Sequence, residues 1–110
     1  MGKMSKTKGK VGEREVVNLY KERGYNARRG QQFKGTPDSP DVEVEEFPWL
    51  HHEVKRVETF NAYKALKQAE EDRSEAQVPV VYHRRNKEEW IVVLKACDFL
   101  NILNRYDHQP

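Results

Sequence analysis

Between residues 40 and 57 the chain reads PDVEVEEFPWLHHEVKRV, and this stretch decides how the chain folds. Two valines alternate with acidic residues after Asp41, which is the pattern of a half-buried strand that begins at the aspartate. Pro48 cannot donate to a strand ladder, so the chain is predicted to bend there. Residues 50–57 then return as a second strand. Asp41 is therefore predicted to lie beside Glu53.

The residues on these two strands also indicate a chemistry. Glu53 and Lys55 are two positions apart, so on an extended strand both side chains leave the same face. Two carboxylates held side by side repel each other, and a hard cation such as Mg²⁺ relieves that repulsion. The ion could polarise a phosphate and activate water, which predicts a metal-dependent phosphodiester hydrolase. An alternative is that Glu53 and Lys55 form an ordinary solvent-facing pair. Asp38 also follows a proline and is a second candidate ligand, but the strand begins at Asp41.

Glu13 is a third candidate carboxylate. A helix is predicted from Val11 to Arg23, where Val16, Val17 and Tyr20 recur at helical spacing, and Glu13 lies on the same stripe. A buried charge requires a cation, a metal or several donors, which favours a functional role. The alternative is that the helix dipole stabilises an acid in the first helical turn.

Downstream segments complete the predicted fold. A strand is expected over residues 24–29, helices over 61–73 and 98–104, and strands over 78–84 and 90–94. The order of helix, three strands, helix, two strands and helix predicts an α/β domain with a mixed five-stranded sheet flanked by helices. Gln68 lies at the edge of the apolar face of the second helix, where its amide could reach the catalytic end of the sheet. An exposed Gln without a role is the alternative.

Several segments together resemble the PD-(D/E)xK nuclease superfamily, and within it the small archaeal-type Holliday junction resolvases and their phage-borne relatives. The segments that carry this resemblance are Gly12-Glu13-Arg14-Glu15, Gly24 to Arg29, Pro40-Asp41-Val42, Glu53-Val54-Lys55-Arg56, and the two strands over 78–82 and 90–94. The resemblance covers most of the chain and implies a restriction-endonuclease-like core.

The resemblance also implies roles for single residues. Glu13, Asp41, Glu53 and the carbonyl of Val54 are expected to bind Mg²⁺, with Mn²⁺ as a possible substitute. The catalytic residues are expected to be Glu13, Asp41, Glu53, Lys55 and Gln68. The expected substrate is branched DNA, most simply a four-way junction, cut by a homodimer. The alternatives are another structure-selective or nicking endonuclease of a phage or mobile element, and a DNA-binding module without catalysis.

His51 departs from the family pattern, which usually has apolar residues at this position and the next. By alternation His51 shares the face of Glu53 and Lys55. From there it could contact a phosphate or buffer a proton, but we expect a partly exposed histidine at a strand edge and leave it outside the catalytic set.

The net charge of +2 conceals an uneven distribution along the chain. Residues 1–34 contain ten Lys or Arg and three acids, whereas residues 35–77 contain five and eleven. Basic residues near the proposed site provide affinity for a phosphate backbone without sequence preference. The candidates for DNA binding are Lys6, Lys8, Lys10, Arg14, Arg28, Arg29, Lys34 and Arg56. A solubilising role is the alternative for those in the N-terminal segment.

Length and composition indicate one small domain. With 110 residues and 36% hydrophobic content the chain can bury only a modest core, which a partner subunit could extend. We expect a flexible basic tail over residues 1–10, a single nuclease domain over 11–104 and a C-terminal tail over 105–110. Cys97 is the only cysteine, so an internal disulfide is excluded, and its neighbours predict a buried thiol. No apolar segment suggests a membrane partner, and we expect a soluble, cytoplasmic prokaryotic protein, possibly phage-encoded.

Overall fold

A computed structural model describes the backbone of residues 2–30 and 39–107, and side chains within 9–30 and 39–106. Its elements are α1 (Gly2–Lys21), β1 (Ala27–Arg29), β2 (Val42–Val44), β3 (Leu50–Arg56), α2 (Ala62–Asp72), β4 (Val78–Arg84), β5 (Ile91–Val93) and α3 (Ala96–Asp107). The order agrees with the one predicted from the sequence.

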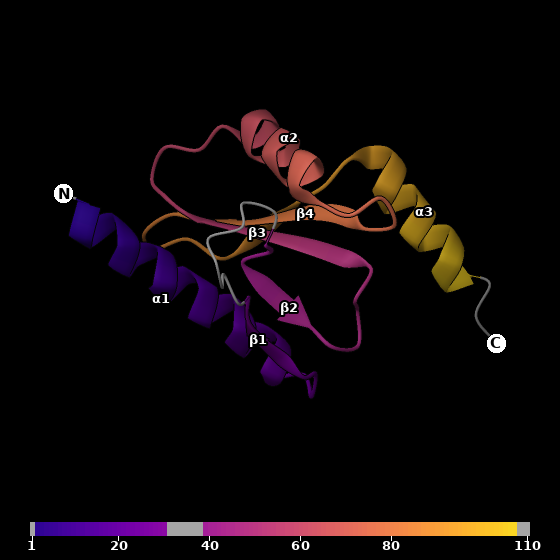
Figure 1. Cartoon of the computed structure of the whole chain (residues 1–110), viewed down its shortest axis with the longest axis horizontal. Coiled ribbons are helices and arrows are strands. Elements are labelled where there is room, and N and C mark those ends of the chain that lie inside the picture. The colour runs from indigo at the N-terminus through magenta and orange to yellow at the C-terminus, as the bar shows by residue number, and fades with distance from the viewer. Residues whose placement is uncertain (1, 31–38, 108–110) are drawn as a thin grey trace.

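The five strands form one mixed sheet in the order β1-β2-β3-β4-β5. Neighbouring strands are antiparallel except β3 and β4, which are parallel and are joined through α2. A parallel pair needs such a crossover, because a tight turn can only reverse the chain. Helices α1 and α2 cover opposite faces of the sheet (Figure 1). The predicted α/β architecture with a five-stranded mixed sheet flanked by helices is therefore confirmed.

Each helix covers its own hydrophobic cluster. On the α1 side the buried residues are Val16, Val17, Ala27, Val42 and Val44. On the α2 side they are Ala65, Ala69 and Val81. The small alanines let α2 approach the sheet closely. Side chains alternate along a strand, so consecutive residues of β3 point in turn toward the α1 side and the α2 side of the sheet.

Two glycines permit close approaches that place the proposed site. A Cβ atom at Gly12 of α1 would lie 2.8 Å from Cβ of Arg56, so only glycine allows the helix this close to β3. A Cβ atom at Gly30 would lie 1.8 Å from the carbonyl oxygen of Pro40. The N–H of Gly30 donates to the carbonyl of Asp41 at 2.9 Å. Gly30 therefore fixes the backbone at the start of β2.

The outer helices differ from the sequence predictions at their ends. Helix α1 begins at Gly2, so it starts nine residues before the predicted start at Val11 and runs through the segment predicted to be a flexible tail. Lys and Met are good helix formers, and this segment contains no proline to stop the helix. Helix α3 extends to Asp107, past the predicted end at 104, and Cys97 is exposed rather than buried. No helix in the described part of the chain is long and apolar enough to cross a membrane.

A polar chain of three side chains connects α1 to the sheet. The hydroxyl of Tyr82 donates to that of Tyr20 at 2.7 Å, and the Tyr20 hydroxyl lies 2.8 Å from Nε2 of His52. With its own oxygen accepting from Tyr82, Tyr20 can donate its proton to His52. Burial, together with the neighbouring His51, lowers the pKa of His52 to about 4. His52 is therefore neutral at physiological pH.

We predict that His52 makes the fold sensitive to acid. A depressed histidine pKa contributes stability above the unfolded value of about 6.5, and that stability is lost as the pH falls toward the folded value. His52→Gln keeps an acceptor for Tyr20 and removes the titrating group. When the pH falls from about 7 to about 4.5, the unfolding free energy of the variant should decrease by about 2 kcal/mol less than that of the wild type. Urea denaturation at both pH values measures this, and an equal loss in both proteins would contradict it.

Candidate active site

Asp41 and Glu53 meet where β2 begins, as the sequence predicts. The backbone N–H of Val54 donates to Oδ2 of Asp41 at 2.8 Å, and the N–H of Asp41 donates to the carbonyl of His52 at 2.9 Å. Glu53 directly precedes Val54 on β3, so its carboxyl group comes close enough to Asp41 for the two to interact. The Glu53 side chain is 7% exposed, so the alternative of a solvent-facing pair is wrong for this residue.

The electrostatics at Asp41 are those of a carboxylate held in an unfavourable place. Burial raises the pKa of Asp41, and the charge of Glu53 raises it further. Glu13 adds a smaller contribution in the same direction, while the N–H of Val54 opposes the shift. Three acidic residues from separate segments therefore interact at this point. Such an arrangement attracts a proton or a cation.

Glu13 reaches the site from the middle of α1. Because the helix begins at Gly2, Glu13 is not in the first helical turn, and the dipole alternative does not account for it. Its Oε1 accepts from Nε of Arg29 at 2.9 Å, and its side chain is 17% exposed. Arg29 is therefore the cation that allows this carboxylate to be partly buried.

Lys55 and Gln68 meet above the sheet. Nζ of Lys55 donates to Oε1 of Gln68 at 3.2 Å, which joins β3 to α2. Lys55 shares the face of Glu53 by strand alternation. Gln68 of α2 therefore reaches β3 and holds the ammonium group of Lys55.

The donors present fit a hard divalent cation. The N–H and the carbonyl of a residue in an extended strand point to the same side, so the carbonyl of Val54 is directed toward Asp41 as its N–H is. Pro40, the residue before Asp41, has no backbone N–H, so it cannot donate a hydrogen bond to the carbonyl of Val54. Carboxylate and carbonyl oxygens are the ligands that Mg²⁺ prefers. Within residues 9–30 and 39–106 no three His, Cys, Asp or Glu side chains are arranged as a ready-made metal site. Glu13 would have to turn from Arg29 to become a third ligand.

His51 is not where the sequence predicted it. Its exposed fraction is 0%, because β3 is the central strand of the sheet and α2 lies over that face. Nε2 of His51 lies 3.7 Å from Oε1 of Glu53. The prediction of a partly exposed histidine at a strand edge is wrong, although alternation placed the residue on the correct face.

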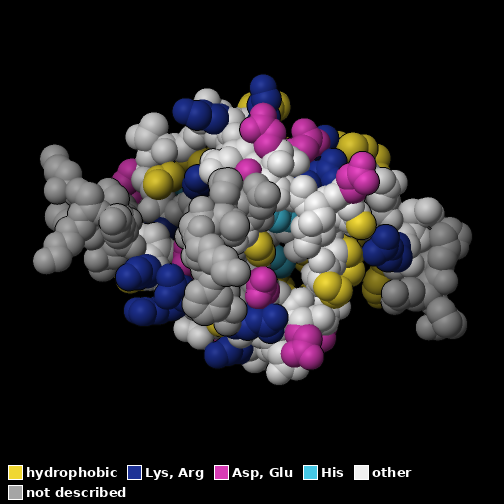
Figure 2. Space-filling view, viewed as in Figure 1, with side chains coloured by type: hydrophobic (Ala, Val, Ile, Leu, Met, Phe, Trp, Pro, Cys, Tyr) yellow, Lys and Arg dark blue, Asp and Glu magenta, His cyan; other side chains and the backbone are white. Residues whose placement is uncertain are grey.

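Basic side chains surround a shallow cavity of about 420 Å³ between α1 and β1. The cations that line it are Arg14, Lys21, Arg28 and Arg29. Figure 2 shows Lys and Arg side chains gathered where α1 and β1 lie. Arg29 connects this cavity to Glu13, and Arg28 pairs with Glu43 at 3.1 Å. Lys21 was not predicted, because a single lysine near the end of a helix carries no distinctive pattern.

Other predicted DNA contacts have different outcomes. Lys10 is exposed and stays a candidate. Arg56 is 13% exposed and its Nη2 donates to Oδ1 of Asn86 at 2.9 Å, so little of its guanidinium is open to a phosphate in this conformation. The side chains of Lys6 and Lys8, and the whole of Lys34 and Asp38, lie outside the described residues.

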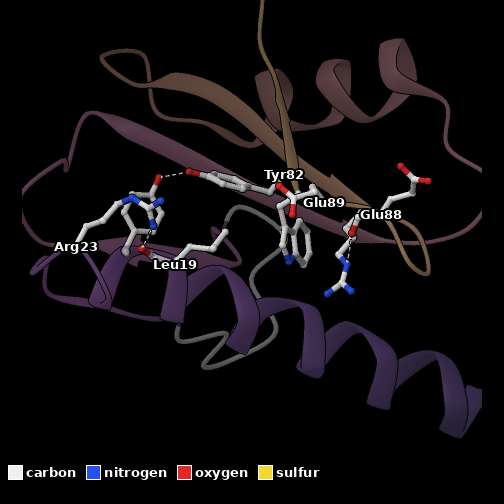
Figure 3. A pocket seen from close by; sticks show the side chains of 8 residues that line it. Leu19, Arg23, Tyr82, Glu88 and Glu89 are labelled. Atoms are coloured by element: carbon white, nitrogen blue, oxygen red, sulfur yellow. Dashed lines mark hydrogen bonds between the residues drawn. The ribbon is translucent and has the colours of Figure 1, made fainter.

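A separate cavity of about 490 Å³ lies between α1 and the β4–β5 hairpin (Figure 3). Tyr82 and Leu19 line it, as do Arg23, Glu88 and Glu89. Its charges are mixed, and none of the predicted catalytic residues contributes to it. This cavity therefore adds nothing to the carboxylate site.

Comparisons with protein-family models, curated proteins and solved structures found no match for this chain.

We predict that Asp41→Asn stabilises the protein in the presence of a chelator. A carboxyl group with a raised pKa contributes full stability below its unfolded pKa of about 3.9, and this is lost as the pH rises through the folded value. Asn keeps an acceptor for the Val54 N–H without the charge. At pH about 8 the unfolding free energy should rise by about 1–2 kcal/mol, and the wild type should lose more stability than the variant as the pH increases.

Glu43→Gln on the same strand is the matched control, because Glu43 is half-exposed and pairs with Arg28. It should not raise stability. Urea denaturation in chelator measures both variants. A fall in stability for Asp41→Asn, or an equal rise for Glu43→Gln, would show that the carboxylate at Asp41 is not held under repulsion.

Proposed function

We propose that this protein is a metal-dependent DNA endonuclease of the PD-(D/E)xK type, with a restriction-endonuclease-like core, most simply a four-way junction resolvase. The observation that carries the proposal is the convergence of Asp41 and Glu53: the Val54 N–H binds Asp41 directly after Glu53, and the charge of Glu53 raises the pKa of Asp41. Lys55 lies on the same face of β3 as Glu53. The acids repel each other here, and a divalent ion would relieve that repulsion.

Each residue of the site would have a separate role. Asp41, Glu53 and the carbonyl of Val54 would hold Mg²⁺ or Mn²⁺, with Glu13 joining directly or through water. When bound, the ion supplies polarisation of the scissile phosphate and a more acidic water. Lys55 orients or deprotonates the attacking water and stabilises negative charge that develops on the phosphate oxygens. Gln68 positions the ammonium group of Lys55 through the 3.2 Å hydrogen bond.

The basic cavity beside Glu13 supports a nucleic acid as the substrate. Its four cations lie on the α1 and β1 side of the carboxylates, where backbone phosphates next to the scissile one could be held. Acidic residues at the end of α2, such as Glu71, lie on another element and need not face the duplex. Charge of this kind supplies affinity and orientation, while the carboxylates supply the chemistry.

A second copy of the chain would provide the two sites that a two-fold symmetric junction requires. Helix α3 and the edge strand β5 offer a surface for it. Phe99, Leu100 and Leu103 on α3 are 49%, 61% and 44% exposed, and Ile91 on β5 is 52% exposed. An edge strand can pair with a copy of itself. The exposed apolar surface and the open edge together favour self-association.

We predict that the protein cuts labelled four-way junctions in Mg²⁺ or Mn²⁺ and not in chelator. Paired symmetric cuts on the junction alone would select a dimeric resolvase, and cuts in forks, nicked or linear duplex would select a broader endonuclease. Lys55→Ala and Glu53→Gln should each lower the cleavage rate by about 100-fold or more. Gln68→Ala should lower it by about tenfold, because it only positions Lys55.

Lys67→Ala is the matched control, since this lysine is exposed on α2 next to Gln68. It should cut at the wild-type rate. Full activity in Lys55→Ala or Glu53→Gln would contradict the assignment of the site. Binding of junctions without cleavage in either metal would identify a DNA-binding module that lacks catalysis.

We also predict that the basic cavity sets DNA affinity. In chelator, Lys21→Ala and Arg14→Ala should each lower the affinity for DNA, and the loss should be the same for DNA of different sequences. Each should reduce the slope of log affinity against log salt by about 1, because one phosphate of the DNA is no longer neutralised. Fluorescence anisotropy over a salt series measures this. Lys64→Ala on α2 is the control, and a fall in affinity as large as that of Lys21→Ala would place the DNA elsewhere.

A further inference from the structure

His51 is a buried polar residue whose presence packing does not explain. Its exposed fraction is 0%, and within the described part of the chain neither Nδ1 nor Nε2 has a hydrogen-bond partner. The charged group beside it is the carboxylate of Glu53, with Oε1 3.7 Å from Nε2. A buried polar group without a partner lowers stability, and an apolar side chain would fill the same space without that penalty.

The next residue shows what a satisfied histidine looks like on the same strand. His52 is also 0% exposed, but it faces α1 and its Nε2 lies 2.8 Å from the hydroxyl of Tyr20. His51 faces the opposite side, toward Glu53 and α2. One histidine is therefore explained by a partner within the fold. The other is directed at a residue of the proposed metal site.

We propose that His51 is a positioning residue for Glu53: its ring N–H donates to Oε1 and so determines which carboxylate oxygen is presented to the divalent ion. The inference rests on the proposed function. A hydrogen bond of this kind needs a separation of about 2.9 Å, so the present 3.7 Å must shorten by less than one ångström. A small rotation of the ring or of the carboxylate supplies that movement.

The physical consequence is an effect on metal affinity rather than on folding. A free carboxylate samples several orientations, and binding an ion must select one of them. A donor fixed behind one oxygen makes that selection in advance. Removal of such an outer hydrogen bond typically lowers metal affinity by about 10–100-fold. Because β3 holds His51 rigidly between β2 and β4, the donor is preorganised.

The test is to measure Mn²⁺ and Mg²⁺ binding to the DNA-free full-length protein by titration calorimetry. His51→Leu should weaken binding by about 10–100-fold and raise the melting temperature in chelator. His51→Gln, whose amide nitrogen can reach the place of Nε2, should stay within about threefold of the wild type. His51→Asn, whose shorter amide cannot reach Glu53, should resemble His51→Leu.

His52→Leu is the matched control, since it removes an equally buried histidine from the other face. It should lower the melting temperature and leave metal affinity unchanged. If the wild type binds neither ion, the proposed function fails. If the wild type binds and His51→Leu binds equally well, only the role of His51 fails. Equal weakening in His51→Gln and His51→Leu would also overturn the donor role, and the comparison of Gln with Asn decides the matter if His51→Leu does not fold.

Discussion

The hydrogen bond from the Val54 N–H to Oδ2 of Asp41 is the interaction on which the proposed site depends. It replaces a rung of the β2–β3 ladder by a side-chain contact, and so it fixes a carboxylate at the point where backbone pairing begins. The same bond directs the Val54 carbonyl toward the acids. Gly30, which directly follows β1, supports it, because only glycine lets the backbone approach Pro40. The repulsion between Asp41 and Glu53 is thus built into the sheet.

The parts of the site that the sequence revealed are those governed by strand alternation. A period of two places Glu53 and Lys55 on one face and His52 on the other, and the structure has them so. Strand β4 has the predicted bounds, since its first five residues form an unbroken apolar run and polar residues follow them. Alternation also placed His51 beside Glu53. It could not show burial, which depends on α2 crossing over that face.

The features that the sequence did not reveal depend on contacts between distant segments. Arg56 follows the catalytic strand and carries a charge, which suggested a phosphate contact. Its guanidinium instead reaches Asn86, thirty positions later, and α1 closes over it at Gly12. The partner of Glu13 is Arg29, which no local pattern identifies. The start of α1 was missed because lysines separated by small residues fit both a helix and an irregular tail.

His51 and His52 illustrate how a small domain accommodates function at the expense of stability. The two residues share chemistry, burial and strand, yet they differ in partner because adjacent side chains point to opposite faces. His52 joins α1 to the sheet through Tyr20, so the fold gains from it. Neither His51 nor the charge of Asp41 stabilises the fold in this way. Both unfavourable groups lie around Glu53. A chain of this size has little core with which to offset them, so their concentration at one point indicates that the point is functional.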